Sequence, residues 1–262
     1  VKHGTATPGG GFPVYGDAFA ATLNEVDPTL AVTPTNTKGS TENVPLLEEG
    51  KLDTGQCTGE VLYEAIAGIG RKPADVKILS AMYSNSGMFI VRADNPYKTV
   101  ADLKGKPIAW GAAGSGFIVL ARYVMDGLGL DMMKDFEPHL LQKAGDGPAM
   151  VLDGRAAALW GGGVGWPGFT AVSSGPKGAR FIGQTADEIK RVTSKYTFIK
   201  PITLPANSYP GQTAAVSTVG SWSFVLARTT LPDEVAYRLA RALHKGEAAI
   251  GTRLEQARES TL

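Results

Sequence analysis

The chain has 262 residues, 43% of them hydrophobic and 19% charged, a composition typical of a globular protein rather than a disordered or membrane-spanning one. Lys and Arg exceed Asp and Glu by 26 − 25 = 1, with no block of one sign, so nucleic acid is not expected as a partner. The one cysteine, Cys57, excludes an internal disulfide framework and a cysteine-cluster metal site.

The first part of the chain alternates strand and helix signals. Residues 4–13 read as a strand end and a glycine loop, and Phe19, Leu23 and Val26 then share one face of a helix over 16–26. The further elements expected here are a strand over 31–35, a helix over 42–49, a strand over 52–56, a helix after Thr58 and β-type runs over 76–82 and 87–91.

The second part repeats this order. A short helix over 100–104 and a strand over 107–110 lead into the glycine loop 111–116, which opens a helix that reaches Gly127. A strand over 156–160 ends in a third glycine-rich run, 161–167. The remaining elements expected are strands over 136–142, 180–183, 198–204, 216–219 and 223–226, and helices over 148–153, over 187–194 and after Pro232.

Strands that alternate with helices predict mainly parallel sheets covered by helices on both faces. Two such series, each opening with strand, glycine loop and helix, predict an α/β protein of two lobes. In open α/β sheets a ligand binds beyond the carboxyl ends of the strands, which is where the glycine loops fall. We therefore expect a ligand cleft between the two lobes.

The glycine loops favour an anion site. Glycine makes up 33 of the 262 residues, nearly twice the usual share of about 7%, and it is clustered. Gly114-Ser115-Gly116 precedes a helix, so its backbone N–H groups and the Ser115 hydroxyl suit an anion. The first loop has the spacing of a phosphate-binding loop, but Gly10 and Gly11 replace its Lys and its Ser or Thr, which disfavours ATP or GTP hydrolysis. For a single loop, tight turns are the simpler interpretation; three loops at strand ends favour a ligand site.

Catalytic and metal signals are weak. His3, His139 and His244 are far apart and have no metal-ligand spacing, so each reads as a surface or hydrogen-bonded structural residue. Ser115 lacks the Gly-x-Ser-x-Gly elbow of a nucleophilic serine, and Cys57 has no histidine near it in sequence. No cofactor, no metal and no catalytic residue are expected.

Four stretches, in this order, resemble the TAXI class of solute-binding proteins, which serve TRAP-type secondary transporters. Together they span nearly the whole chain, and their ordered combination is more specific than any one of them. They are residues 4–10; residues 38–43 with Leu46-Leu47 and Gly50; residues 91–94 with 100–106 and 114–116; and residues 209–212 with 218–220.

The resemblance implies a type II periplasmic-binding-protein fold, no catalysis, export with a cleaved signal peptide to the periplasm, and delivery of a small organic carboxylate to a TRAP permease. It implies a first lobe of residues 1–91 and 219–262, a second lobe of residues 92–218, and hinge crossings near Val91 and Thr218. A monomer is expected. The alternatives are an ABC-type receptor for a sulfonate or a thiamine precursor, and an enzyme that acts on a phosphorylated or pyrimidine-like molecule.

The expected ligand site combines the glycine loops with aromatic rings from both lobes. Lys38 either faces the pocket, where it would favour a dianion, or is solvated. Three differences from the family touch this expected site. Lys38 stands where the family has a glycine, residues 11–13 carry one aromatic ring where the family has two, and residues 160–167 are richer in glycine. The identity of the solute therefore does not carry over from the family. The expected ligand-binding residues are Thr7, Gly10, Gly11, Phe12, Lys38, Gly39, Ser40, Thr41, Gln56, Tyr83, Gly114, Ser115, Gly116, Trp160, Gly162 and Trp166.

Overall fold

The computed structural model describes residues 1–260, which form two compact units. Unit 1 comprises Val1–Ser84, Gly114–Gly116 and the chain from Trp222 onward. Unit 2 comprises Asn85–Ala113 and Phe117–Ser221. The chain therefore passes from one unit to the other four times, and the segment Gly114–Gly116 belongs to unit 1 although both of its flanks belong to unit 2. The lobe boundaries expected from the sequence stay a prediction.

The sheet of unit 1 has a parallel core. Strand β1 (Lys2–Gly4) pairs in parallel with β2 (Thr33–Thr35) and with β3 (Thr54–Thr58), and His3 lies opposite Thr54. The second half of β10 (Val216–Arg228) adds an antiparallel strand beside β3. Since β1, β2 and β3 run the same way, their carboxyl ends lie at one edge of the sheet.

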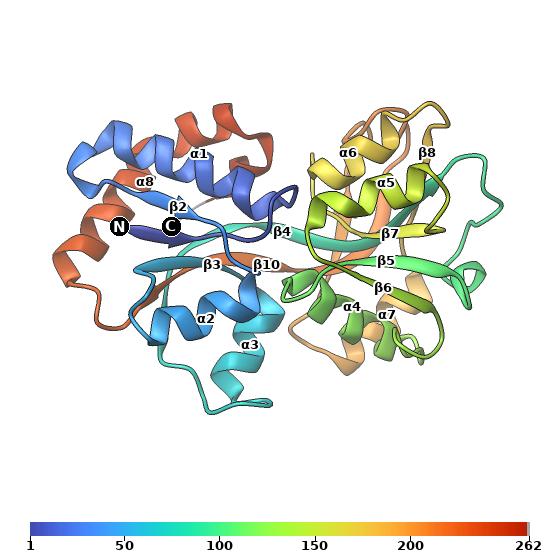
Figure 1. Ribbon diagram of the computed structural model, residues 1–262, viewed down its shortest axis with the longest axis horizontal. Helices are drawn as coiled ribbons and strands as arrows, with labels where there is room; N and C mark the ends of the chain where they lie inside the picture. Colours follow the sequence, from blue (N-terminus) through green and yellow to red (C-terminus); the bar gives the residue numbers. More distant parts are fainter. Residues whose placement is uncertain (261–262) are drawn as a thin grey trace. The chain divides into compact units, whose positions relative to one another are not determined.

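Helices cover both faces of this sheet (Figure 1). Helices α1 (Gly11–Val26) and α8 (Asp233–Arg253) lie on one face, and α2 (Ser40–Glu48) and α3 (Gly59–Ala67) lie on the other. The apolar face of α1, with Phe19 and Leu23, packs against Leu239 and Leu243 of α8 in one buried cluster. Short 3-10 helices follow α1 at Pro28–Leu30 and α8 at Glu255–Glu259.

The sheet of unit 2 is also built on parallel strands. Strand β5 (Pro107–Ala112) pairs in parallel with β6 (Glu137–Leu141) and β7 (Ala158–Gly161). Antiparallel pairs extend it: β4 (Val76–Arg92) with β7 and with β8 (Ala179–Ile182), and β9 (Lys200–Leu204) with β10.

Each face of this sheet has its own core. Phe89 and Val91 of β4 belong to one buried cluster, and the alternating residues Met88 and Ile90 belong to another, as the period of two in a strand requires. Burial on both faces explains why β5 and β7 are nearly continuous apolar runs. The helices are α4 (Gly116–Gly127) and α7 (Ala186–Lys195) on one face and α5 (Gly147–Leu152) and α6 (Pro167–Ser173) on the other (Figure 1).

The structure corrects several expected elements. The runs 76–82 and 87–91 form one 17-residue strand, β4, and the runs 216–219 and 223–226 form one strand, β10. Polar residues interrupt the apolar pattern in both, whereas backbone pairing between neighbouring strands continues through them. The expected helix over 100–104 is a single 3-10 turn, Ala101–Leu103, and α6 was not expected, because its short sequence has a weak pattern.

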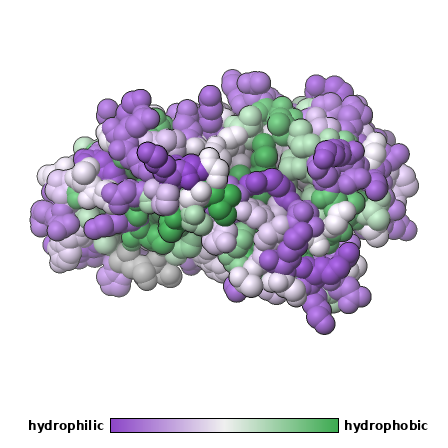
Figure 2. All heavy atoms as spheres, turned by 90° about the horizontal axis from the view of Figure 1, so that it is seen from below, coloured by the Kyte–Doolittle hydropathy of each residue, from purple (hydrophilic) through white to green (hydrophobic). Residues whose placement is uncertain are grey.

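The surface is mixed. On the face drawn in Figure 2, hydrophilic residues predominate and hydrophobic areas appear between them. Exposed apolar side chains on the chain include Ile66 after the middle of α3 and Met133 in the segment after α4. Among residues 1–260, no helix combines the length and the apolar character that crossing a bilayer would need.

Candidate functional site

Three helices of unit 1 begin at the carboxyl-end edge of its sheet, because α1, α2 and α3 follow β1, β2 and β3 directly along the chain. Their N-cap residues are Gly10, Gly39 and Thr58, and none of these caps its helix with a side-chain hydrogen bond. By contrast, α7 in unit 2 has a full capping box, in which Thr185 and Glu188 cap each other's backbone N–H groups. The edge of unit 1 therefore presents helix N-termini that side chains leave open to other acceptors.

Two of the expected glycine loops touch each other at this edge. The backbone N–H and the Oγ1 hydroxyl of Thr41 donate to the carbonyl oxygen of Gly114, over 3.3 and 2.9 Å. Gly39 has φ +118° and Gly114 has φ +90°, and a Cβ on Gly39 would lie 3.0 Å from the Gly114 oxygen. A side chain at either position would be strained and crowded, so both glycines are needed for this approach.

Thr58, at the end of β3, also takes part in this contact. A Cβ on Gly116 would lie only 2.1 Å from Oγ1 of Thr58, and the backbone N–H of Thr58 donates to Oγ of Ser40 over 3.1 Å. Lys38 is exposed, and its backbone N–H donates to the carboxylate of Glu42 over 2.6 Å. The structure thus brings residues 38–41, Thr58 and residues 114–116 together within unit 1.

The loop before α1 lies against an aromatic group. Gly9 has φ +85°, and the Gly10 N–H donates to the carbonyl of Thr7. Phe12 packs edge-on against Tyr83, with ring centroids 6.4 Å apart, and both rings are buried. Phe12 and Tyr83 therefore form the apolar backing of this loop.

Gln56 belongs to a buried polar group beneath α1. Its Nε2 lies 2.9 Å from Nε2 of His3, and Nδ1 of His3 lies 2.9 Å from Oγ1 of Thr54. Burial lowers the pKa of His3 to about 3, so the imidazole is neutral at ordinary pH. A Cβ on Gly16 of α1 would lie 2.9 Å from the Gln56 amide nitrogen, so the absence of a side chain there makes room for this group.

The three expected site residues of unit 2 lie at the end of β7. Trp160 is 1% exposed and donates from Nε1 to the Phe117 carbonyl over 2.9 Å, within the cluster that packs under α4. Trp166 is also buried but belongs to the cluster on the opposite face. Gly162 has φ +155°, and a Cβ there would lie 1.7 Å from the Ser86 carbonyl oxygen, so only glycine fits.

Two residues that secure this third loop were not expected from the sequence. Oγ of Ser86 accepts the Gly163 N–H over 2.8 Å, and the Tyr209 hydroxyl accepts the Trp166 N–H over 2.8 Å and donates to the Gly163 carbonyl. Tyr209 opens one of the stretches that carry the family resemblance, so a signal existed for it. Ser86 is one serine in a polar part of β4 and carried no signal.

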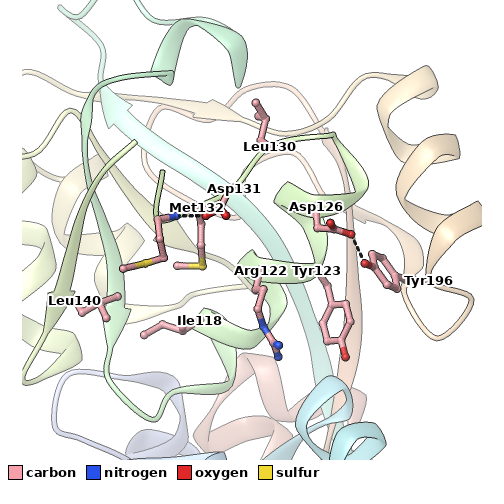
Figure 3. A pocket seen from close by; sticks show the side chains of 10 residues that line it. Ile118, Arg122, Tyr123, Asp126, Leu130, Asp131, Met132, Leu140 and Tyr196 are labelled. Atoms are coloured by element: carbon pink, nitrogen blue, oxygen red, sulfur yellow. Dashed lines mark hydrogen bonds between the residues drawn. The ribbon is translucent and has the colours of Figure 1, made fainter. Parts of the chain in front are cut away.

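A surface pocket of about 580 Å³ lies elsewhere in unit 2, beside α4 and the segment that follows it (Figure 3). The charges that line it have partners: Asp126 pairs with Lys195 and accepts from the Tyr196 hydroxyl, and Asp131 accepts the Met133 N–H over 2.8 Å. The Arg122 guanidinium lies over the Tyr123 ring, 5.1 Å from its centroid. None of the expected site residues lines this pocket. Its lining residues are Ile118, Arg122, Tyr123, Asp126, Leu130, Asp131, Met132, Met133, Leu140 and Tyr196.

Nucleophile and metal chemistry have little support in the part of the chain that the structure describes. Burial raises the pKa of Cys57, which keeps it a neutral thiol. No group of three or more His, Cys, Asp or Glu side chains within residues 1–260 has an arrangement that could hold a metal ion. His139 and His244 lie beside the nearby carboxylates of Glu137 and Glu247.

Comparison with known proteins places the chain by family and fold. A family model described as the NMT1-like family matches residues 3–262. The alkanesulfonate-binding protein SsuA of Xanthomonas axonopodis pv. citri, bound to MOPS, is 19% identical over 98% of this chain and 78% of its own, with a TM-score of 0.56.

Two further solved structures are similar. A TctC solute-binding protein from Polaromonas is 18% identical over 98% of this chain and 87% of its own, with a TM-score of 0.53. The binding-protein component of an ABC phosphonate transporter from Pseudomonas aeruginosa is 11% identical over 98% of this chain and 79% of its own, with a TM-score of 0.59. At these identities the likeness shows the fold alone, and it confirms the expected α/β fold of two-lobed periplasmic binding proteins of type II.

Proposed function

The chain belongs to the NMT1-like family, and from this premise we propose that it is an extracytoplasmic solute-binding protein that captures a small organic carboxylate, either an organic acid or an amino acid. It delivers this solute to an integral membrane permease of the TRAP type. Of the three similar structures described above, two are named for acidic solutes, an alkanesulfonate and a phosphonate, and the third is named as a solute-binding protein. An acidic solute is therefore the common expectation.

The observation that carries the proposal is the open edge of unit 1. Helices α1 and α3 start there without side-chain caps, and α2, whose Thr41 N–H already donates to the Gly114 carbonyl, starts beside the glycine segment that ends in Gly116. Backbone N–H groups and the positive ends of helix dipoles bind anions without a cationic side chain. This fits a chain whose net charge is only +1.

Rough magnitudes agree with this mode of binding. Micromolar affinity corresponds to about −8 kcal/mol. Hydrogen bonds to a charged group contribute roughly 1.5–3 kcal/mol each, and a helix terminus adds about 0.3–2 kcal/mol. Three or four such bonds contribute roughly 5–12 kcal/mol before the cost of association, which is the order of magnitude that micromolar binding needs.

The finer parts of the proposal rest on the sequence resemblance to the TAXI class. They are the periplasmic location, the monomeric state, the TRAP permease and the lobe closure that would accompany capture. Catalysis is not part of the proposal, because the hydroxyl–imidazole pair of Thr54 and His3 in unit 1 is fully buried and Cys57 is a buried neutral thiol.

The test starts from protein freed of co-purified solute by partial unfolding and refolding. Native mass spectrometry before this step identifies any solute that co-purifies, and calorimetry afterwards screens carboxylates, amino acids, sulfonates and phosphonates of two to six carbons. We expect a carboxylate to bind at micromolar concentration. Tighter binding of a sulfonate would favour the ABC-type alternative, and turnover of a phosphorylated or pyrimidine-like compound without acid binding would overturn the proposal.

Ser115→Ala probes the glycine segment directly. If Ser115 contributes a hydrogen bond to the acid group, its loss weakens binding by about 1–3 kcal/mol, which is roughly 5- to 150-fold in Kd. Ser174→Ala, at an exposed serine after α6, is the matched control and leaves the affinity unchanged. Equal affinities of the Ser115→Ala variant and the wild type would remove Ser115 from the site.

A further inference from the structure

Strand β8 of unit 2 has a backbone edge without a partner strand. Among residues 1–260, β8 pairs with β4 alone, in an antiparallel ladder. The Ala93 N–H donates to the Gly178 carbonyl over 3.2 Å, and this bond fixes which pairs of the ladder are hydrogen-bonded. Because such pairs alternate along an antiparallel ladder, every second residue after Gly178 bonds to β4. The N–H and C=O groups of Ala179 and Phe181 therefore point away from β4.

A surface groove of about 680 Å³ follows this free edge. Ala179 and Phe181 line the groove and are partly exposed, so the edge can be reached from the surface. The four residues of β8 span about 13 Å, and their free edge offers two N–H donors and two C=O acceptors. All of the lining residues belong to unit 2. Donors and acceptors that alternate along a strand match the backbone of another extended segment.

Side chains hold the loops on both sides of the groove in place. The half-buried Arg180 guanidinium donates to three backbone carbonyls within residues 93–97, over 2.8 to 3.2 Å. On the other side, the buried Gln212 amide donates to the carbonyls of Pro205 and Ala214, both over 2.9 Å. The groove is therefore preformed, which lowers the cost of binding an extended segment.

The charged side chains that line the groove are two cations, Lys98 and Arg180, and one anion, Glu188. Glu188 caps the backbone at the start of its own helix, α7, and the partners of Arg180 named above are neutral carbonyls. Asp102 accepts the Lys98 backbone N–H over 2.9 Å but does not line the groove. The groove therefore favours an occupant with an acidic side chain.

From this arrangement we propose that the groove beside β8 binds an extended, acidic segment of a partner protein, which adds to the sheet as a strand next to β8. Its backbone bonds to Ala179 and Phe181, and its acidic side chain lies near Lys98 and Arg180. A second copy of the chain would present an equally recessed β8, whereas a single extended segment fits between the walls of the groove.

The inference goes beyond the proposed function, because none of the expected solute-site residues lines this groove. Two of the stretches that carry the family resemblance do contribute to its lining, namely residues 100–106 through Val100 and Ala101, and residues 209–212 through Gly211 and Gln212. These stretches thus have a role that solute binding at the edge of unit 1 does not require of them.

The experiment uses the full chain, labelled with ¹⁵N, and two blocked peptides of about five residues, the length that spans β8. Both peptides are rich in valine and threonine, and the central residue is glutamate in one and lysine in the other. We expect the glutamate peptide to slow hydrogen exchange of the Ala179 and Phe181 amides about tenfold or more. We also expect it to bind about fivefold more tightly than the lysine peptide.

Ala179→Pro tests the pairing with the free edge. Proline removes the N–H that points away from β4 and is accepted where an edge strand faces solvent, so the ladder with β4 is kept. The Kd of the glutamate peptide should rise about fivefold or more. Ala186→Pro is the matched control, because it places proline at the first position of α7, outside the groove, where helices accept it.

Lys98→Gln tests the charge preference without changing the backbone. It should reduce the preference for the glutamate peptide, and its matched control, Lys190→Gln, should not, because Lys190 is an exposed residue of α7 outside the groove. The thermal unfolding of all four variants, compared with that of the wild type, shows whether each one is folded.

Three results would overturn the inference. One is unchanged exchange of the Ala179 and Phe181 amides at millimolar peptide. Another is equal Kd values for the glutamate peptide in folded Ala179→Pro and in the wild type. The third is protection of these amides that increases with protein concentration in the absence of peptide, which would assign the edge to a second copy of the chain. The outcome of the calorimetric screen for carboxylates does not affect this test.

Discussion

His3 is a buried histidine whose two ring nitrogens are both engaged inside unit 1. It lies between Thr54 and Gln56 and stacks on Phe19 at a centroid distance of 4.9 Å. Desolvation disfavours its charged form and lowers its pKa to about 3. The residue therefore links the stability of unit 1 to pH.

Protonation of His3 in the unfolded chain makes the stability of unit 1 depend on pH. In the unfolded chain histidine titrates near 6.5, so between pH 6.5 and about 3 the unfolded state binds a proton that the folded state does not. Stability is therefore fully present above pH 6.5 and falls as the pH is lowered through this window. Between pH 7 and pH 5, His3 alone removes about 2 kcal/mol.

Urea unfolding of the wild type and of His3→Gln at pH 7, 6 and 5 measures this effect. The variant is less stable at pH 7, because it loses the ring contacts, but its free energy of unfolding should fall less steeply with pH. His244→Gln, at an exposed histidine on α8, is the control substitution. Equal slopes for wild type and His3→Gln would show that His3 is not the titrating group.

The sequence identified individual residues better than their partners. It favoured a structural role for His3 and a helix that begins after Thr58, and Thr58 is the N-cap of α3. It did not show that His3 meets Gln56, because these residues are 53 positions apart and only the register of β1 against β3 brings them together.

At the scale of elements, the pair α1 and α8 shows how packing overrides intrinsic propensity. Gly246 lies within α8, where glycine costs about 1 kcal/mol relative to alanine. A Cβ at this position would lie 2.4 Å from Cγ2 of Thr22 on α1. The glycine therefore allows the two helices to approach.

Gly246→Ala should destabilise the protein, since overpacking costs about 1–3 kcal/mol and exceeds the gain in helix propensity. Thr22→Ser removes the methyl group and keeps the hydroxyl that accepts from Arg253, so it should restore most of the loss in the double variant. The measurement is the free energy of unfolding in urea.

Gly251→Ala on the same helix is the control for that experiment. A Cβ there would lie 3.1 Å from Cγ and 3.6 Å from Cα of Arg258, so a shift of the Arg258 side chain accommodates it and the substitution should be neutral or stabilising by up to about 1 kcal/mol. Stabilisation by both substitutions alike would mean that α1 and α8 are not closely packed at Gly246.

The local pattern of apolar residues predicts most of the helices and strands, and the two strands that it divides have one cause in common. The long strands β4 and β10 were expected as two pieces each, because polar residues such as Ser84 and Asn85 break the apolar run. Backbone hydrogen bonds to a neighbouring strand do not depend on this pattern of side chains. A single-sequence argument detects side-chain periodicity, so it misses strands that are held by their neighbours.

At the scale of the whole molecule, each unit has its own buried core, and the net charge of +1 gives no strong overall field. Solute binding should therefore depend little on ionic strength compared with a site built on clustered lysines. Binding should also stabilise the fold, because a solute that binds only the native state shifts the unfolding equilibrium.

Thermal unfolding with and without the best acid of the screen measures this linkage. At a concentration of 100 times Kd the expected stabilisation is about 2.7 kcal/mol, and Tm rises by several degrees. No rise in the wild type at saturating acid would contradict specific binding to the folded state.

The sequence by itself determined the fold class, the absence of a nucleic-acid signature and the position of glycine loops at strand ends, since these depend on composition and on patterns a few residues long. Only the tertiary structure decided that Thr41 meets Gly114, 73 positions away, and that Tyr209 holds the loop at Trp166, 43 positions away. Strand order and register set such contacts, and neither is written in local periodicity.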